Sequence, residues 1–416
     1  MTKNESIIYT CILGGMTLLT GCSSKQLCQI DVENPLSQER TDMAEISISE
    51  LNLPKNKAFK LVGVEDNEQI PYQVTHDGKL IFLVYHIPAN GTKTFRIEKG
   101  KAMAIDSVVR GRRYPERKDD MAWENDKAAY RAYGPALQAS GERSFGYDIM
   151  NKSTDRLVLD ARYAAEQDPV AWKKIAEWKA QGLKQKADSL EKAISYHVDH
   201  GDGMDCYSVG ATLGGGTTAL MVGDSIVYPY CWTKGEVLDN GPLRFTTRLT
   251  YNPTTIDGMA NVTETRVISL DEGSHLNKTV ITYANVTKPT QLVSGIVIHK
   301  ENREGYFTDA ANGIIAYADS TDNPRNGNGV IYVGAVLGNA PASAYAQWFS
   351  PAEQQTHSGA MGHVLAQSTY KPGQQYIYYW GSGWSKNDVK DYPTWKAMLN
   401  DYAKRIKSPL KVKVRK

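Results

Sequence analysis

The chain has 416 residues, more than one typical domain, and its 48 basic and 46 acidic side chains leave a net charge of +2. Balanced charge without a long basic run argues against a nucleic-acid-binding role, and the length predicts two packed modules with a large core. The 24 tyrosines and 8 tryptophans, against 7 phenylalanines, suit a strand-rich fold. Such amphipathic rings also stack on sugar faces.

The first 21 residues have the features of a secretory signal peptide. Lys3 precedes a short apolar run over residues 7–19, and small residues come before Cys22. The Leu19-Thr20-Gly21-Cys22 ending resembles the bacterial lipobox, whose cysteine is acylated. We therefore expect a mature chain that begins at a lipid-bearing Cys22 and is held in the cell envelope, at the periplasmic face of an outer membrane. The alternatives are an ordinary signal peptide and a buried strand.

Residues 22–105 are predicted to form an N-terminal β-sandwich. Short alternating runs, separated by turn-forming Pro, Asn, Asp and Gly residues, recur at sandwich-like spacing. The runs cover residues 45–49, 59–64, 70–74, 79–84 and 92–97.

Residues 106–416 are predicted to form a second, larger module. Its stretch 168–194 is rich in Ala, Lys and Glu with apolar spacings of three and four, which predicts a helix. A Pro near the start of 392–405 predicts a closing helix. Between them we expect long antiparallel strands of a large sandwich, at 219–222, 225–228, 243–251, 262–270, 276–283, 295–300, 329–333 and 375–380. In this region Cys206 and Cys231 either form a disulfide or remain buried thiols.

The first cluster with chemical potential is Trp123-Glu124-Asn125-Asp126 with Arg131 behind it. A stacking ring, a carboxylate, an amide and a cation within a dozen residues suit a polar sugar pocket. The alternative is a helix N-terminus capped by Asn125 or Asp126.

The second cluster runs from Tyr196 to Tyr207. If the chain is extended here, His197 and Asp199 share one face and His200 lies on the other. A paired imidazole and carboxylate suit proton transfer. The oxygens of Asp199, Asp202 and Asp205 also suit a hard divalent cation, although their spacing matches no standard loop. A structural turn is the third possibility.

Two further groups lie on predicted strands. Arg244 and Arg248 would project from one strand face, where guanidinium groups suit either a carboxylate substrate or cross-strand ion pairs. His299 and Lys300 end another strand, where such a pair is either catalytic or, more commonly, simply solvated. Trp384 belongs to a glycine-spaced Trp pair that either stacks on sugar or packs.

Together these motifs resemble domain-of-unknown-function family 4861, which is found in glycan-utilisation loci of glycan-degrading bacteria. The resemblance covers nearly the whole mature chain and rests on Trp123-Glu124-Asn125-Asp126, the Tyr196-His197-x-Asp199-x-Gly201-x-Gly203-x-Asp205-x-Tyr207 run, Asp239-Asn240-Gly241-Pro242-Leu243-Arg244 and Leu276-Asn277-Lys278. It implies a mainly β fold: a galactose-mutarotase-like super-β-sandwich with an N-terminal β-sandwich and a few helices. It also implies a role in oligosaccharide breakdown, in which at least one similar protein removes water from a terminal uronic acid.

From this chemistry we predict β-elimination on a uronic-acid-containing oligosaccharide, with no required cofactor, although a divalent cation remains an alternative. A base must remove the C5 proton, a task for His197 or His200, while Arg244 neutralises the adjacent carboxylate and Tyr207 protonates the leaving oxygen. The remaining residues predicted to bind substrate are Trp123, Glu124, Asn125, Arg131, Arg248, His299, Lys300 and Trp384. The alternatives are a glycoside hydrolase, for which Glu124 and Asp205 are candidate carboxylates, and a non-catalytic glycan-binding lipoprotein.

Overall fold

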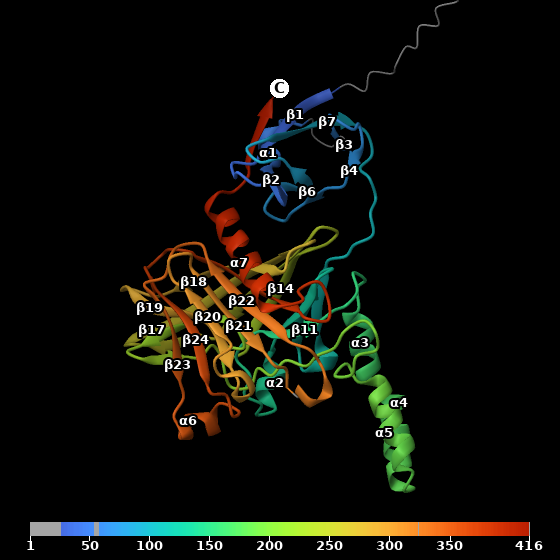
Figure 1. Cartoon of the computed structure of the whole chain (residues 1–416), viewed down its shortest axis with the longest axis vertical. Coiled ribbons are helices and arrows are strands. Elements are labelled where there is room, and N and C mark those ends of the chain that lie inside the picture. Colours follow the sequence, from blue (N-terminus) through green and yellow to red (C-terminus); the bar gives the residue numbers. More distant parts are fainter. Residues whose placement is uncertain (1–25, 54–57, 323, 416) are drawn as a thin grey trace, which may run out of the picture.

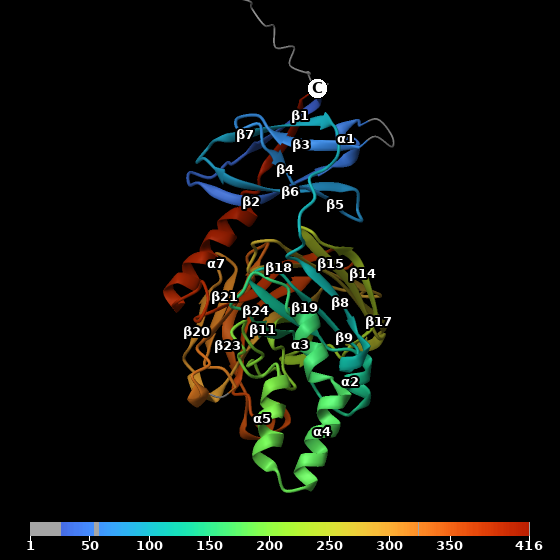
Figure 2. The ribbon, with the colours of Figure 1, turned by 90° about the vertical axis from the view of Figure 1, so that its right-hand side faces the viewer.

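The computed structural model describes residues 26–53, 58–322 and 324–415. Two β-sandwiches of unequal size are stacked along the long axis of the molecule, and a helical hairpin projects from the larger one (Figures 1 and 2). The predicted fold class, mainly β with an N-terminal sandwich and a larger super-sandwich, is confirmed. The predicted signal peptide, residues 1–21, and the predicted lipid-bearing Cys22 lie outside the described residues. Within the described part, no helix combines the length and apolar character needed to cross a membrane.

The N-terminal sandwich pairs a five-stranded sheet, β26-β1-β7-β3-β4, with a three-stranded sheet, β2-β6-β5. Strand β1 alternates as its sequence requires, with Ile30 and Val32 fully buried. The last strand, β26, pairs with β1, so the C-terminus returns to this sandwich instead of ending in the second module. Val412 and Val414 of β26 pack against the core of this sandwich. The elements are β1 (Gln26–Glu33), β2 (Arg40–Ser47), α1 (Ile48–Leu51), β3 (Phe59–Gly63), β4 (Gln69–Ile70), β5 (Gln73–Val74), β6 (Lys79–Ile87), β7 (Thr92–Lys99) and β26 (Lys411–Arg415).

The larger sandwich packs the five-stranded sheet β13-β12-β19-β24-β23 against the sheet β14-β15-β17-β18-β25-β22-β21-β20, with β16 on β17. Most of its long strands were predicted from alternation, which is regular along β17. The strands are β12 (Gly215–Val222), β13 (Ser225–Val227), β14 (Trp232–Asn240), β15 (Arg244–Tyr251), β16 (Thr254–Ile256), β17 (Met259–Asp271), β18 (Leu276–Ala284), β19 (Thr290–Ile298), β20 (Tyr306–Asp309), β21 (Ile314–Asp319), β22 (Ile331–Leu337), β23 (Ser343–Trp348), β24 (Gly362–Tyr370) and β25 (Tyr376–Trp384).

A further four-stranded sheet, β11-β10-β9-β8, packs beside the larger sandwich, in a region where no clear strand was predicted. Every residue of β9, β10 and β11 is buried. A strand buried on both faces has no polar alternation, which removes the signal used to predict strands. The four strands are β8 (Arg110–Tyr114), β9 (Asp120–Glu124), β10 (Ala128–Ala132) and β11 (Asp148–Asn151).

The predicted helices are confirmed, and the stretch 168–194 forms a hairpin of two. Gly182, with φ of 73°, separates α4 from α5, which project away from the sandwich (Figure 2). Helix α7 begins after the cap Asp391 and packs on the outer face of the larger sheet. The helices are α2 (Pro135–Ala139), α3 (Leu159–Glu166), α4 (Pro169–Ala180), α5 (Lys184–Ile194), α6 (Pro351–Thr356) and α7 (Tyr392–Lys407). Cys206 and Cys231 are separate buried thiols, so the disulfide alternative is not formed.

Candidate functional site

A buried arginine links the four-stranded sheet to the loop 195–214. Arg131 on β10 lies opposite Asp148 on β11, and its Nε donates to Asp148 Oδ2 at 2.7 Å. Its Nη2 donates to Asp205 Oδ2 at 2.9 Å, and Nη1 lies 3.5 Å from Asp120 Oδ2. The Tyr133 hydroxyl donates to Asp148 Oδ2 at 2.8 Å. We call these five residues the Arg131 cluster.

The Arg131 cluster holds one cation against three buried carboxyl groups. Burial and the adjacent Asp148 raise the pKa of Asp205, Arg131 opposes both effects, and the resulting pKa is about 6. Burial likewise raises the pKa of Asp120 to about 6. Because both pKa values lie close to neutrality, these carboxyl groups can exchange protons in the range where enzymes use general acids and bases.

His197 lies between Asp205 and solvent. Its Nδ1 is 3.0 Å from the Asp205 carbonyl oxygen and 3.8 Å from Asp205 Oδ2, and its side chain is 52% exposed. A carbonyl oxygen only accepts hydrogen bonds, so Nδ1 carries the hydrogen. Because Nδ1 is used in this way, Nε2 is the ring nitrogen that can accept a proton from a substrate.

Tyr207 connects this region to a second histidine. In the described part of the chain its buried hydroxyl has no hydrogen-bond partner, and its ring centroid is 6.2 Å from that of His299. His299 Nδ1 lies 2.6 Å from Asp319 Oδ2. Burial lowers the pKa of His299, but Asp319 outweighs burial, and the pKa is raised overall. A proton donor without a partner thus stands between the Arg131 cluster and a His–Asp pair.

The loop is held against β11 by a close backbone approach. Asp205 and Met150 form an isolated bridge, and the Met204 and Asn151 backbones exchange hydrogen bonds. Gly203 has φ of 107°, and a Cβ there would lie 2.2 Å from the Asn151 carbonyl oxygen. Only glycine fits at this position, which brings Asp205 within reach of Arg131.

The structure corrects the first predicted cluster except for Arg131. Trp123 is fully buried and donates to Asn277 Oδ1 at 2.7 Å, so neither ring face is open to a sugar. Glu124 pairs with the buried Lys152 and accepts from the first backbone amides of α3. Asn125 caps the tight turn between β9 and β10. These residues were predicted to line a sugar pocket. They have structural roles instead, because β9 is buried inside the protein.

The structure also separates the residues of the second predicted cluster. Residues 195–214 form turns instead of a strand, so His197 and Asp199 do not share a face. Asp199 accepts from the Gly201 and Gly203 amides, Asp202 pairs with Arg162, and Asp205 is buried. The three carboxylates therefore do not converge on a cation, and the described residues contain no group of three or more acidic, His or Cys side chains arranged to hold a metal. His200 is exposed, and its Nε2 lies 3.0 Å from the Ser195 carbonyl oxygen.

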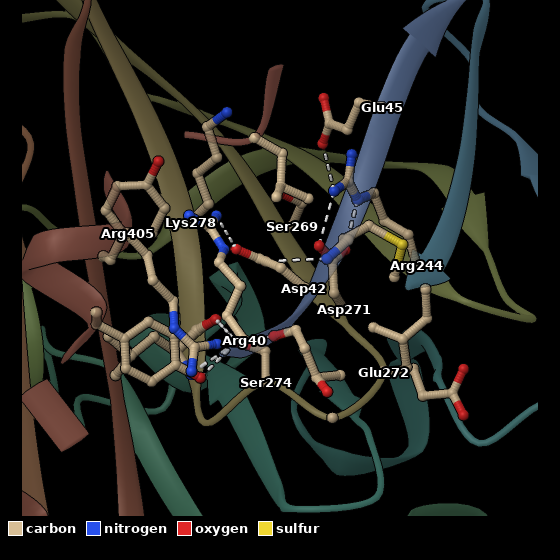
Figure 3. Close-up of a pocket in the computed structure, with 18 of the residues that line it drawn as sticks. Arg40, Asp42, Glu45, Arg244, Ser269, Asp271, Glu272, Ser274, Lys278 and Arg405 are labelled. Carbon is tan, nitrogen blue, oxygen red and sulfur yellow. Dashed lines mark hydrogen bonds and ion pairs between the residues drawn. The ribbon is translucent and has the colours of Figure 1, made fainter. Parts of the chain in front are cut away.

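Arg244 lines a cleft of about 620 Å³ between the two sandwiches (Figure 3). Its guanidinium binds Asp271 at 2.5 and 2.7 Å and Glu45 of the N-terminal sandwich at 2.6 Å. These carboxylates already neutralise the arginine, so the predicted role in binding a substrate carboxylate is replaced by a role in joining the sandwiches. Arg248 pairs with Glu236 on the neighbouring strand, the cross-strand alternative.

Of the two remaining predicted binding residues, Trp384 differs from its predicted role and Lys300 lies at the surface. Trp384 is buried, and its Nε1 donates to the Asn328 carbonyl at 2.8 Å, so it packs instead of stacking on sugar. Lys300 is exposed, with its Nζ 3.7 Å from Glu301 Oε1, so its role in binding substrate stays a prediction. The structure thus brings together Arg131, His197, Asp205, Tyr207 and His299 out of the residues singled out in the sequence.

Sequence reasoning missed Asp120, Asp148 and Asp319. Asp319 ends the apolar strand run Ile314–Asp319, and a carboxylate at the end of an apolar run was an available signal. Asp120 and Asp148 each begin a short, fully buried strand whose sequence lacks alternation. No comparable signal marks them.

Comparison with known protein families identifies the family of this chain. The family described as Domain of unknown function (DUF4861) matches residues 32–412. The chain belongs to this family. Uncharacterized protein P7 of Formosa agariphila is 25% identical over 430 residues, which cover 99% of this chain and 100% of that protein. The predicted resemblance is therefore confirmed.

Two solved structures from Enterococcus faecalis are also similar, each at 8% identity over 94% of this chain. One is a protein in the glycosyl hydrolase family 38, with a TM-score of 0.49, and the other an α-mannosidase, with a TM-score of 0.42. The chain covers 47% and 46% of them, about half their length.

Proposed function

We propose that the protein is a carbohydrate-active enzyme of polysaccharide breakdown that carries out β-elimination on uronic-acid-containing oligosaccharides. The observation that carries the proposal is the Asp205 carboxyl group. It is buried, has a pKa of about 6, shares Arg131 with Asp148 and lies directly beneath the half-exposed His197. Acid–base chemistry near neutral pH needs such a group.

In the proposed reaction His197 Nε2 takes the C5 proton of the uronate. The electrons of the C5–H bond form the C4–C5 double bond, and the C4–O bond breaks. The Tyr207 hydroxyl donates its proton to the leaving oxygen, which departs as water or as the hydroxyl of a sugar. Asp205, 3.8 Å from His197 Nδ1, stabilises the imidazolium that forms.

The uronate carboxylate must be neutralised for C5 to lose its proton. Arg117 suits this task in place of Arg244, because its buried Nη1 lacks a hydrogen-bond partner among the described residues. Its Nε donates to the Tyr196 hydroxyl at 3.0 Å, which places the guanidinium next to the Arg131 cluster. A fork with one free donor suits a carboxylate.

The geometry favours elimination over hydrolysis. Glycoside hydrolases place a sugar between two carboxyl groups that are about 5–9.5 Å apart. Asp148 and Asp205 instead bind the same Arg131 nitrogen, and both are almost fully buried, so no sugar fits between them. The carboxylates predicted for hydrolysis were Glu124 and Asp205, and Glu124 is already bound to Lys152.

We also propose that a lipid on Cys22 holds the enzyme at the cell envelope, facing the periplasm. The lipobox-like sequence before Cys22 supports this proposal. Mass spectrometry of the protein from its native membrane would test it, since acylation adds the mass of several fatty chains to the N-terminal peptide.

The proposal is tested by incubating the protein with uronate-terminated oligosaccharides and following the ultraviolet absorbance of the conjugated enoate. We expect the chromophore with wild type, a loss of about 10²-fold or more in rate for His197→Ala, and little change for His200→Ala, the matched control on the same loop. Wild type that forms no chromophore on any uronate oligosaccharide would overturn the proposal, as would equal rates for the two variants.

A further inference from the structure

An exposed tryptophan lies at the end of β23, the edge strand of the five-stranded sheet in the larger sandwich. Trp348 is 40% exposed at the end of β23, whereas Trp123, Trp232, Trp380 and Trp395 are buried in the core. The Tyr306 ring of β20 lies 6.0 Å away in an edge-on arrangement. Strands β20 and β23 are the edge strands of opposite sheets and lie next to each other, so the two rings meet where the sheets come together at this edge of the sandwich.

A guanidinium group accompanies the two rings. The Arg303 Cζ lies 5.0 Å from the Trp348 ring centroid. Arg303 is exposed and forms no ion pair or hydrogen bond with a described side chain, while Lys300 and Glu301 before it face each other. Stacking on a ring holds the guanidinium in place and leaves its N–H groups available to an incoming oxygen.

Trp348 lies at the same end of the sheet β13-β12-β19-β24-β23 as His299. Ile298, Gly362 and Trp348 are paired in one row across β19, β24 and β23. Neighbouring strands are about 4.8 Å apart, so the Trp348 backbone is roughly 10 Å from Ile298, the residue before His299. Gly362, between them in this row, has no side chain to obstruct the path.

We propose that Trp348, Tyr306 and Arg303 form a carbohydrate subsite, which binds one pyranose ring of an oligosaccharide whose reacting end lies near Tyr207 and His299. The C–H face of the sugar stacks on Trp348, and Arg303 donates to its hydroxyl or carboxylate oxygens. The inference rests on the proposed function for its substrate class, but it concerns binding alone.

The test measures the affinity for saturated uronate and neutral oligosaccharides of increasing length by calorimetry. The protein carries Asp205→Asn, so that binding is measured without turnover. We expect Trp348→Ala to weaken binding about tenfold, equivalent to about 1.4 kcal/mol, for the oligosaccharides long enough to span both regions. Trp172→Ala, at a 38% exposed tryptophan on the projecting helix α4, is the matched control and should bind as the parent does.

The two ligand series identify what Arg303 binds. If Arg303→Gln weakens only the uronate series, the subsite takes a carboxylate; if it weakens both series, it binds hydroxyls, and both results support the subsite. The inference is overturned if no oligosaccharide binds, or if Trp348→Ala and Trp172→Ala bind equally. Failure of elimination with intact, Trp348-dependent binding would reject the proposed reaction and leave the subsite standing.

Discussion

Replacing Asp205 by Asn tests the electrostatics of the Arg131 cluster without changing the shape of the side chain. The pKa of this carboxyl group is about 6 in the folded chain, against 3.8 for an unperturbed Asp. The folded state therefore holds the proton more tightly than the unfolded state, so the stability from this group is complete below about pH 4 and is lost as the pH rises through 6. The shift of about two units corresponds to about 3 kcal/mol, of which about 1 kcal/mol falls between pH 5 and pH 7.

The measurement is the free energy of unfolding in urea at a series of pH values. Asn cannot titrate, so the stability of Asp205→Asn relative to wild type should increase with pH by about 3 kcal/mol in total. Asp224→Asn, at an exposed carboxylate in the turn after β12, is the control and should follow wild type. If the curves of Asp205→Asn and wild type run parallel from pH 4 to pH 8, the assigned pKa is wrong.

Three further substitutions separate structural from catalytic roles. Arg131→Met leaves buried carboxyl groups without their cation and should cost about 3–5 kcal/mol, so an unchanged melting temperature would contradict the ion network. Tyr207→Phe removes a hydroxyl that has no partner, so stability should change by less than about 1 kcal/mol, whereas turnover should fall about 10²-fold or more. Arg244→Ala should lower the urea midpoint at pH 7, because burial alone would raise the pKa of Glu45 and the loss of Arg244 removes a charge that helps to lower it to about 2. The turnover rate of Arg244→Ala should stay near that of wild type. A large loss of rate would instead show that Arg244 has a catalytic role.

Elements with alternating patterns were predictable from the sequence. The strands of the N-terminal sandwich and β15, β17 and β18 each have one polar face, and the hairpin of α4 and α5 has regular apolar spacing. Strands β9 to β11 were not predictable, because both faces are buried and the local sequence carries no period. The pairing of β26 with β1 joins residues nearly 400 positions apart, which no local pattern records.

The site was partly predictable, because residue type and spacing drew attention to the Tyr196–Tyr207 run. His197, Asp205 and Tyr207 belong to the candidate site, but their partners come from other strands. A sequence cannot distinguish a carboxylate that pairs across a domain boundary, as Glu45 does with Arg244, from one that meets a buried arginine, as Asp148 does. Burial determines which tryptophans are accessible to a sugar. Trp123 and Trp384 are in the interior, whereas Trp348, which was not singled out from the sequence, is at the surface.

The most direct test of the account is the mass balance of the reaction in heavy-oxygen water. Elimination at a uronate breaks the C4–O bond without adding water, so the products carry no heavy oxygen from the solvent and include an unsaturated sugar. We predict this result for wild type, with product formation greatly reduced in His197→Ala. Products that together weigh one water more than the substrate, with heavy oxygen at the new reducing end, would show hydrolysis and contradict the account.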